Sequence, residues 1–434
     1  MQIDALTLAA LTDEFERDLR GARVDDVIQP TPHSIALQLW GGGRNRWLVI
    51  SAHPQLAHLR LTSAKPRKLA TDPPAFVMLL RKHLEGARLV AAQQPAWERV
   101  IELGFARGAD LAEGKAATWL IAEVMGRFSN IILTDAERVI LGALRLASAE
   151  TNHYRAIMPH EPYLSPPPQM RTLAGATLPQ IAGQAVTAND LRAAAREALD
   201  AAMAQASANG ATDAKASVKG KRGRRAATPT VGGVIAAHVL GFGRELGREV
   251  AARALGGADA PVDDAPVDDV WKALARETHA LAALAEQRDW RPTLVYAPSN
   301  AAGSGTASGT AGASDTTERP IALAVYLPRQ YPPDFALRNA ASVNDALDLL
   351  FSGAEWRVEL EQAKGDLRRL LQTQRDRCLR KGEALASEMA AQAEASQLRR
   401  EADTLLAFQS DVAPAAHSAT LTDAWASEEG ATLT

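Results

Sequence analysis

PPAFVMLLRKHLEGARLVAAQQPAWER, residues 73–99, is the stretch that decides the fold of this 434-residue chain. Its opening pair of prolines suits the first turn of a helix, where backbone donors have no partner within the helix. Phe76, Leu80 and Leu84 then share one helical face. Gly86 follows, and glycine is the residue type that most readily takes the left-handed conformation at a helix end. The first half of the stretch therefore predicts a short helix that ends before Gly86.

The second half of the stretch predicts a strand, a turn at residues 94–99 and a second strand that continues to residue 103. Trp97, Glu98 and Arg99 place an aromatic ring, an acid and a base side by side at the tip of this turn. Such a tip has two interpretations. It is either a solvated hairpin end or a group of side chains that a rigid scaffold presents to a partner.

Three blocks of sequence carry a resemblance to a known family. They read PPAFVMLLRKHLEG at residues 73–86, IAEVMGRFSNIIL at 121–133 and SAHPQLAHLRLT at 51–62. Together they resemble the N-terminal domain of the NFACT proteins, whose bacterial members are the RqcH ribosome quality-control factors, formerly called fibronectin-binding-protein-A-like. The resemblance extends, with gaps, over almost the whole chain. It implies an α+β fold with a β-rich N-terminal domain similar to that of the Fpg-type DNA glycosylases.

The chain is too long to fold around a single hydrophobic core, and its length indicates about three domains. With the resemblance, it predicts a β-rich N-terminal domain, a helical domain with a helix–two-turn–helix unit, a small mixed region and one arm of a long coiled coil. The expected boundaries are 1–172 for the NFACT N-terminal domain, 173–257 for the helical domain with a basic insertion at 207–229, 258–352 for a linker and middle α+β region with a disordered loop at 298–319, 353–408 for the coiled-coil helix and 409–434 for a tail.

Apolar spacing and turn residues predict the elements of the N-terminal domain. Residues 4–20 are expected to form an amphipathic helix, and the expected strands cover 23–28, 34–40, 46–51, 118–125, 131–134 and 139–146. His53 and His58 follow the third of these strands. No Cys, Asp or Glu lies between or beside them, so we expect packing or surface histidines and no metal site.

Arg127, Ser129 and Asn130 form a second candidate site, in the loop between two expected strands. A guanidinium forks onto two phosphate oxygens, and a hydroxyl and an amide can complete such a contact. The alternative interpretation is a Ser-Asn turn with a surface arginine. In the family, an imidazole or similar side chain commonly stands where this chain has Phe128.

The expected helical domain carries a basic run with two interpretations. Helices are predicted at 187–206, capped by Thr187 or Asn189, and within the helix–two-turn–helix unit at 230–255. Between them, residues 215–225 hold six basic residues and no acid. The run lacks apolar periodicity, so we expect it to be disordered, and it either solvates a loop or holds RNA through counterion release. The candidate RNA-binding residues in this run are Lys219, Lys221, Arg222, Arg224 and Arg225.

The C-terminal part predicts strands at 293–297 and 321–327, a helix capped by Ser342 and a long helix at 353–408. Along this long helix, Leu360, Leu367, Leu371, Cys378 and Leu385 follow a coiled-coil spacing. In the family a returning antiparallel helix covers such a stripe, whereas residues 409–434 contain no second heptad stripe. We therefore expect the chain to be a fragment or a natural truncation, whose long helix frays or pairs with a second copy.

Composition excludes several classes of protein. A formal net charge of −3 argues against a protein that coats nucleic acid uniformly, so RNA contacts must come from local patches. The single cysteine, Cys378, excludes internal disulfides and fits a reducing compartment. No apolar run is long enough to cross a bilayer, and no basic segment followed by an apolar core opens the chain. We expect a cytoplasmic protein with no membrane partner.

The sequence also lacks the motifs of an enzyme. It contains no glycine-rich phosphate loop with a lysine, no serine or cysteine nucleophile motif and no metal cluster. It opens Met1-Gln2-Ile3, without the N-terminal proline and neighbouring glutamate that the glycosylases use. We therefore expect no catalytic residue, no metal and no cofactor.

The resemblance implies an adaptor that binds large ribosomal subunits, and their rRNA, while they still carry a peptidyl-tRNA. Such a factor brings in tRNA, alanyl-tRNA in this family, for messenger-independent tailing of the nascent chain, and the ribosome forms the bond. Glu98 and Arg99 match the family's Asp-Arg pair, which is implicated in gripping tRNA, and Asp4 resembles its opening acid. The candidate tRNA-binding residues are Trp97, Glu98, Arg99, Arg127, Ser129 and Asn130. The alternatives are a fibronectin-binding surface adhesin and a non-catalytic nucleic-acid-binding protein with a DNA-glycosylase-like fold.

Overall fold

The computed structural model of the chain divides into two compact units, Met1–Glu355 and Trp356–Thr434. It describes residues 3–69, 72–150, 152, 154–167, 171–173, 176–178, 180–213, 229–262, 268–298, 319–414, 416–422 and 432–433. The first unit holds the parts that the sequence assigns to three domains, since one continuous hydrophobic core runs from its first helix to Phe351.

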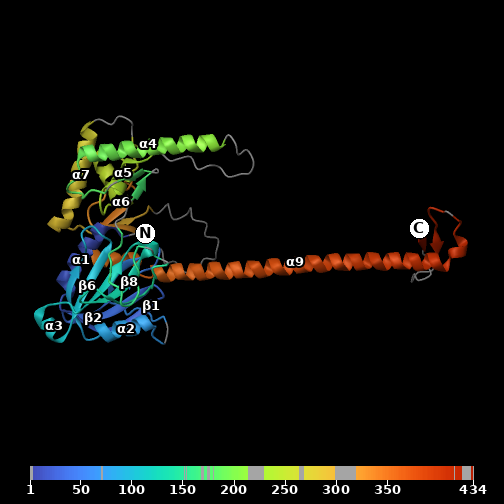
Figure 1. Cartoon of the computed structure of the whole chain (residues 1–434), viewed down its shortest axis with the longest axis horizontal. Helices are drawn as coiled ribbons and strands as arrows, with labels where there is room; N and C mark the ends of the chain where they lie inside the picture. The colour runs from blue at the N-terminus through green and yellow to red at the C-terminus, as the bar shows by residue number, and fades with distance from the viewer. Residues whose placement is uncertain are drawn as a thin grey trace. The chain divides into compact units, whose positions relative to one another are not determined.

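The first unit is built around a nine-stranded antiparallel sheet with the strand order β4-β3-β2-β1-β5-β6-β7-β8-β9 (Figure 1). The strands are β1 Arg23–Thr31, β2 Ser34–Gly41, β3 Arg44–Ser51, β4 His58–Thr62, β5 Arg88–Gln93, β6 Val100–Ala106, β7 Thr118–Glu123, β8 Asn130–Asp135 and β9 Ile140–Ala143. Sequential strands pair, as short connections favour, except that β5 pairs with β1 and not with β4. This large antiparallel sheet with helices confirms the predicted α+β class.

Helix α1, Ala5–Leu19, covers part of this sheet, and its sequence explains where it starts and what it buries. The carboxylate of Asp4 accepts a hydrogen bond from the backbone N–H of Thr7 at 2.7 Å, which satisfies one of the unpaired donors at the helix start. Leu8, Leu11 and Phe15 are fully buried, as their spacing predicts.

Helix α2, Ala75–Leu84, ends as predicted, with Gly86 in the left-handed region at a φ of 81°. Its buried face differs by one residue from the prediction, because Val77, Leu80 and Leu84 are buried while Phe76 is only partly so. This face packs on β1. A further helix, α3, spans Gly108–Glu113 between β6 and β7.

Arg145 ties together the two ends of the sheet. It follows β9, at one edge, and its Nη2 donates to the carbonyl of Ala52 at 2.8 Å, beyond β3 near the other edge. The same nitrogen lies 3.3 Å from Nδ1 of His33, in the β1–β2 turn. The sheet therefore curls, and it brings the β1–β2, β3–β4 and β7–β8 connections to one side.

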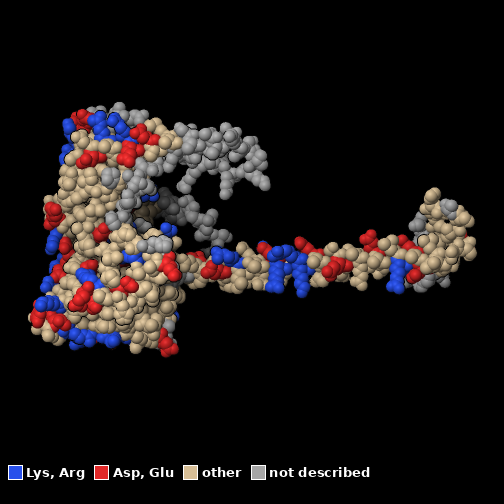
Figure 2. Space-filling model, viewed as in Figure 1, with Lys and Arg blue, Asp and Glu red and all other residues tan. Residues whose placement is uncertain are grey.

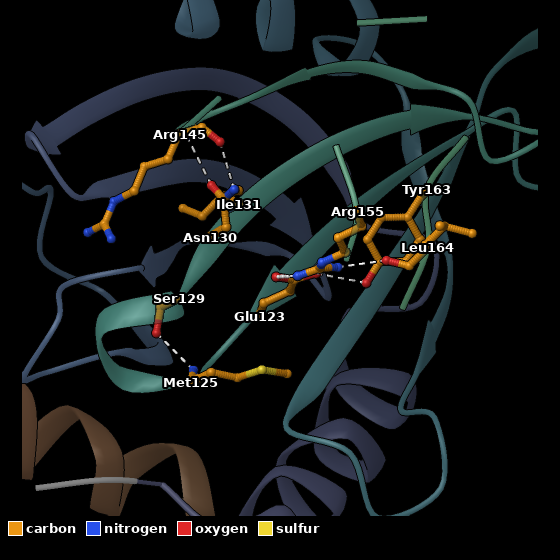
Figure 3. Close-up of polar contacts among 9 residues, drawn as sticks. All are labelled: Glu123, Met125, Ser129, Asn130, Ile131, Arg145, Arg155, Tyr163 and Leu164. Carbon is orange, nitrogen blue, oxygen red and sulfur yellow. Dashed lines mark hydrogen bonds and ion pairs between the residues drawn. The ribbon is translucent and has the colours of Figure 1, made fainter. Parts of the chain in front are cut away.

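A buried ion pair fastens the segment after β9 to β7. Arg155 donates from Nη2 and Nη1 to the two carboxylate oxygens of Glu123 at 2.6 and 2.7 Å, and both side chains are less than a tenth exposed (Figure 3). The hydroxyl of Tyr163 donates to the same carboxylate at 3.0 Å, and Arg155 also donates to the carbonyl of Leu164 at 2.6 Å. These donors satisfy the hydrogen-bond acceptors of the Glu123 carboxylate, which is fully buried.

His58 is a packing residue, as expected. Its ring stacks on that of Phe351 with centroids 4.1 Å apart and an interplanar angle of 7°. Nδ1 lies 2.7 Å from the carbonyl of Leu56, a contact that the Nδ1–H tautomer makes as a donor. Burial lowers the pKa of His58 to about 3, so the ring is neutral at pH 7.

Four helices follow the sheet and pack on one another: α4 Ala188–Asp213, α5 Val231–His238, α6 Arg244–Leu255 and α7 Asp268–Gln287 (Figure 1). Thr187 is the cap of α4, because its hydroxyl accepts from the N–H of Asp190 at 3.2 Å. Two short strands, β10 Arg171–Leu173 and β11 Ala176–Leu178, precede α4. Helix α4 continues to Asp213, so the insertion predicted to begin at residue 207 starts as helix, and the basic residues 215–225 lie outside the described residues.

The helix–two-turn–helix unit is confirmed as α5, a glycine-containing turn and α6. Its helices approach closely through Gly232 and Gly247, since a Cβ on Gly247 would overlap the carbonyl oxygen of Gly232. Thr230 caps α5 by accepting from the N–H of Gly233 at 3.1 Å. Two glycines at this crossing allow a backbone contact that any side chain would block.

The middle region forms a three-stranded sheet with the order β13-β12-β14. Its elements are β12 Thr293–Tyr296, β13 Pro320–Ala324, β14 Ala336–Asn339 and helix α8, Val343–Phe351. Strand β14 was not predicted, because its four residues are all exposed and show no apolar alternation. The loop predicted to be disordered, 298–319, lies almost wholly outside the described residues.

Helix α8 docks on the N-terminal sheet through polar contacts with α1 and β4. The buried carboxylate of Glu14 accepts from the backbone N–H groups of Val343 and Asn344 at 2.6 and 2.9 Å. The side-chain amide of Asn344 pairs with both backbone groups of Leu61. The edge strand β4 is thereby covered by a helix. Ser342 caps α8, as predicted, by accepting from the N–H of Asp345 at 2.9 Å.

The second unit consists mainly of helix α9, Ala354–Ala407, which confirms the predicted long helix. Leu367, Leu371 and Leu385 on its stripe are each about half exposed or more. The tail contributes the short strands β15 Leu421–Thr422 and β16 Thr432–Leu433. The expectation that the long helix frays, or that a second copy covers its leucine stripe, stays a prediction.

Candidate nucleic-acid interface

The turn between β5 and β6 is held by its own backbone and by the start of α1. Gln94 donates from Nε2 to the carbonyls of Ala5 and Glu98 at 2.9 and 2.7 Å. The N–H of Glu98 also donates to the carbonyl of Pro95 at 3.0 Å. The N–H of Val124, after β7, donates to the carbonyl of Arg99 at 2.8 Å. These contacts fix the turn that carries the predicted triplet to two neighbouring elements.

Trp97 packs inward from the turn. Its ring lies against Phe242 with centroids 5.8 Å apart, and it is half buried on the main core. Gly241, at a φ of 75°, makes room for it, because a Cβ there would lie 2.6 Å from that of Trp97. The turn is therefore not a solvated hairpin end. Trp97, predicted among the RNA contacts, joins the sheet to the helix–two-turn–helix unit and so positions its two neighbours.

Arg99, Glu98 and Asp4 form a partly buried group of charges beside this turn. Burial lowers the pKa of Arg99, and the carboxylates of Asp4 and Glu98 oppose that shift. Burial in turn raises the pKa of Asp4 and of Glu98, while the Arg99 charge lowers both. A guanidinium stays protonated in proteins, so Arg99 is a desolvated cation that one more anion or an aromatic face can stabilise.

Asp4 is absent from the predicted site residues, although two signals pointed to it. It stands at the helix cap, and it matches the family's opening acid. Only the folded chain brings it to Arg99, which lies far along the sequence.

The structure corrects the prediction that the side chains of Ser129 and Asn130 are available for a phosphate contact (Figure 3). Both side chains are buried. The hydroxyl of Ser129 accepts from the N–H of Met125 at 2.8 Å. The amide of Asn130 accepts from the N–H of Ile131 at 2.9 Å and of Arg145 at 3.0 Å, and donates to the carbonyl of Arg145 at 2.8 Å. They shape the loop around the 3₁₀ turn Gly126–Phe128, and their polar atoms bond the backbone of that loop and of Arg145.

Arg127 keeps its predicted exposure and lies beside an exposed aromatic ring. Its guanidinium lies 4.6 Å from the ring centroid of Phe128, which is 67% exposed. Arg145 donates from Nη1 to the carbonyl of Arg127 at 3.2 Å, so a second cation lies close by. A cation next to an exposed ring offers a nucleic acid both phosphate contact and base stacking. Figure 2 shows basic and acidic side chains interspersed on the visible face of the sheet-containing unit, so contacts of this kind are local.

The described part of the chain offers neither a metal site nor a membrane span. It contains no group of three His, Cys, Asp or Glu side chains placed to hold a metal ion. Among the described helices, none has both the length and the apolar character needed to cross a bilayer.

Over about four fifths of its length, the chain has the fold of two solved bacterial fibronectin- or fibrinogen-binding proteins. The N-terminal part of the fibronectin/fibrinogen-binding protein from Streptococcus suis superimposes with a TM-score of 0.52 at 19% identity, covering 81% of this chain and 99% of that one. The fibrinogen binding protein from Staphylococcus aureus gives 0.50 at 20% identity, over 80% and 97%. The NFACT N-terminal and middle domains match residues 4–194 and 225–434. The chain therefore belongs to the NFACT family.

Curated relatives match over part of their length. The Rqc2 homolog RqcH of Bacillus subtilis (strain 168) is 34% identical over 170 residues, 39% of this chain and 30% of the relative. The ribosome quality control complex subunit NEMF of Homo sapiens is 30% identical over 154 residues, 35% and 13%. The archaeal Rqc2 homolog aRqcH of Methanocaldococcus jannaschii is 32% identical over 127 residues, 29% and 17%. The match spans less than a third of each relative's length.

Proposed function

We propose that this chain is a ribosome quality-control factor that acts on the large ribosomal subunit in the cytoplasm. Membership of the NFACT family supports this, together with relatives named as Rqc2 homologs in a bacterium and an archaeon and as a ribosome quality control complex subunit in humans. The interspersed charges fit a protein that recognises a particular RNA assembly through local contacts.

The finer proposal is that the chain recruits tRNA, alanyl-tRNA by family resemblance, to large subunits that still carry peptidyl-tRNA. The observation that carries it is the desolvated Arg99, held beside Glu98 and Asp4 on a turn that packing and hydrogen bonds fix in place. A positioned guanidinium can fork onto phosphate or stack on a base, and a carboxylate can accept from a base amino group. The protein acts as an adaptor that positions substrates, and the ribosome forms the bond.

Arg99→Ala is expected to weaken tRNA binding by about 1 to 3 kcal/mol, because the variant loses a charge-assisted or stacked contact. Arg99→Lys should bind with intermediate affinity, since it keeps the charge and loses the planar fork. Arg17→Ala is the matched control, because Arg17 is exposed and its guanidinium bonds the neighbouring Asp18. A gel-shift titration measures the affinities, and circular dichroism checks the fold. Equal tRNA affinity of Arg99→Ala and wild type would remove this turn from the interface.

The ribosomal part of the proposal is tested by sedimentation of the tagged chain in cell lysate. We expect co-migration with free large subunits, and loss of that peak when the subunits are depleted. Recovery at the cell surface would instead favour the adhesin alternative, and a chain that follows DNA would favour the general nucleic-acid-binding alternative.

A further inference from the structure

A cluster of basic residues forms where the curled sheet brings the β1–β2, β3–β4 and β7–β8 connections together. His33 lies in the first of these connections, His53 in the second and Arg127 in the third. Arg145, which follows β9, links them: its Nη2 lies 3.3 Å from Nδ1 of His33, and its Nη1 donates to the carbonyl of Arg127 at 3.2 Å. The rings of His33 and His53 meet edge to face with centroids 5.4 Å apart. We call these four residues the loop cluster.

Both histidines of the loop cluster are held as neutral rings that carry their proton on Nε2. A guanidinium has no acceptor, so Nδ1 of His33 accepts from Arg145. Nδ1 of His53 accepts from the backbone N–H of Gln55 at 3.1 Å. Burial lowers the pKa of each ring, and the Arg145 charge lowers both further. Nε2–H is therefore the hydrogen-bonding group with which each ring can meet a ligand.

Arg145 is a partly buried cation without a carboxylate partner among the described residues. Its side chain donates three hydrogen bonds, to the His33 ring and to the carbonyls of Ala52 and Arg127. Burial lowers its pKa, and no described acid opposes that shift. Its Nε–H bonds no described residue, and neither Nε of Arg145 nor Nε2 of His33 is sealed from solvent. Figure 3 shows the Arg145 side chain extending away from Asn130.

The loop cluster therefore presents N–H donors and positive charge to a ligand. The donors are Nε2–H of His33 and the guanidinium groups of Arg145 and Arg127, of which Arg127 is exposed. A cation that has lost part of its hydration without gaining a counter-ion is stabilised by an anion. An oxyanion also accepts hydrogen bonds from several donors at once, so it is the class of ligand that these side chains complement.

The surroundings of the loop cluster favour an RNA phosphate over a free anion. The Phe128 ring is 67% exposed and lies 4.6 Å from the Arg127 guanidinium, so it can cover a base next to a bound phosphate. Val124, at the start of the same connection, donates its N–H to the carbonyl of Arg99 at 2.8 Å. The loop cluster and the Arg99 turn thus flank one short segment of chain, and a single RNA strand can touch both.

We propose that His33, Arg127 and Arg145 hold one phosphate group of an RNA strand, with the adjoining base stacked on Phe128. The inference rests on the proposed function, because it gives the tRNA held at Arg99 a second contact. It assigns a binding role to His33 and Arg145, which are absent from the residues predicted from the sequence. The contact is to the backbone, so it adds affinity without selecting a base sequence.

His33→Phe is expected to weaken the binding of tRNA and of a single-stranded adenylate octamer about tenfold, because it keeps a ring but loses a charge-assisted hydrogen bond. His33→Gln should bind within about twofold of the wild type, since its amide offers an N–H group to the phosphate and an oxygen to Arg145. His417→Phe, at an exposed histidine of the second unit, is the matched control. Fluorescence anisotropy measures the affinities, and thermal melting checks the fold.

Arg127→Ala tests the loop cluster at an exposed position, where the fold is not at stake. It should lower the slope of log affinity for the octamer against log salt concentration by about 0.7 to 1, the amount expected for one lost phosphate contact. Arg44→Ala is the matched control, because Arg44 is an exposed arginine at the β2–β3 turn, and it should leave the slope unchanged.

Equal octamer affinities of the wild type and a folded His33→Phe variant would overturn the inference, and so would an unchanged salt slope in Arg127→Ala. A chain that binds inorganic phosphate more tightly than the octamer would also overturn it, because the ligand would then be the free ion. Failure of the proposed function looks different. The octamer would then respond to His33→Phe as expected, while the wild-type chain would bind neither tRNA nor large subunits. A chain that binds no RNA contradicts both.

Discussion

Replacing Arg155 by methionine is expected to lower the free energy of unfolding of the first unit by about 3 to 5 kcal/mol. The variant leaves the fully buried carboxylate of Glu123 with the hydroxyl of Tyr163 as its remaining hydrogen-bond donor among the contacts described above. It also releases the carbonyl of Leu164, which Arg155 bonds at 2.6 Å. Chemical denaturation followed by circular dichroism measures the loss.

Two controls separate the buried pair from charge removal as such. Arg192→Met removes an exposed partner of Asp268, with side chains 46% and 70% exposed, and should cost less than about 1 kcal/mol. Removing both charges, in Glu123→Leu with Arg155→Met, should restore part of the loss because no uncompensated charge stays buried. If Arg155→Met lowered the free energy of unfolding no more than Arg192→Met, burial would not make the Arg155–Glu123 pair important for stability.

The ion pair of Arg155 and Glu123 also helps to hold the turn that carries Arg99. Glu123 ends β7, and the next residue, Val124, donates its N–H to the carbonyl of Arg99. Loosening the end of β7 therefore loosens one of the contacts that fix the turn. We expect Arg155→Met to weaken tRNA binding as well, by less than the direct removal of Arg99.

Gly247→Ala is expected to destabilise the first unit by about 3 kcal/mol. Its Cβ would overlap the carbonyl oxygen of Gly232, and rotation of a side chain cannot relieve a clash between two backbones. Helices α5 and α6 would have to separate, and the turn between them carries the Phe242 ring on which Trp97 packs. The thermal midpoint and the denaturation midpoint should both fall.

Gly243→Ala is the matched control within the same unit. Gly243 caps α6, and a Cβ at this position would meet no atom within 4 Å. The same chemical change should therefore cost less, about 0.5 to 1 kcal/mol, through the poorer cap. If the two variants lost similar stability, close backbone approach would not be the reason for glycine at position 247.

Local signals in the sequence were sufficient to predict those elements whose ends are set by contacts between residues close in the chain. Gly86 ends α2, Ser342 caps α8, and the apolar spacing of α1 is the spacing of its buried face. Each of these involves residues within a few positions of one another, so a window of sequence contains the whole interaction. The same holds for α9, whose apolar residues follow a heptad spacing that can be read within one stretch of sequence.

The candidate site depended on tertiary structure. By itself the sequence determined that an aromatic ring, an acid and a base stand together on a turn, and that Ser129 and Asn130 follow an arginine. Only the folded chain decided that Trp97 packs on Phe242 and that Ser129 and Asn130 are buried in backbone contacts. It alone brought Asp4 to Arg99. The physical reason is that a polar side chain has the same local signature whether it bonds a ligand or a distant backbone group, and burial, which decides between the two, is set by residues far away in the sequence.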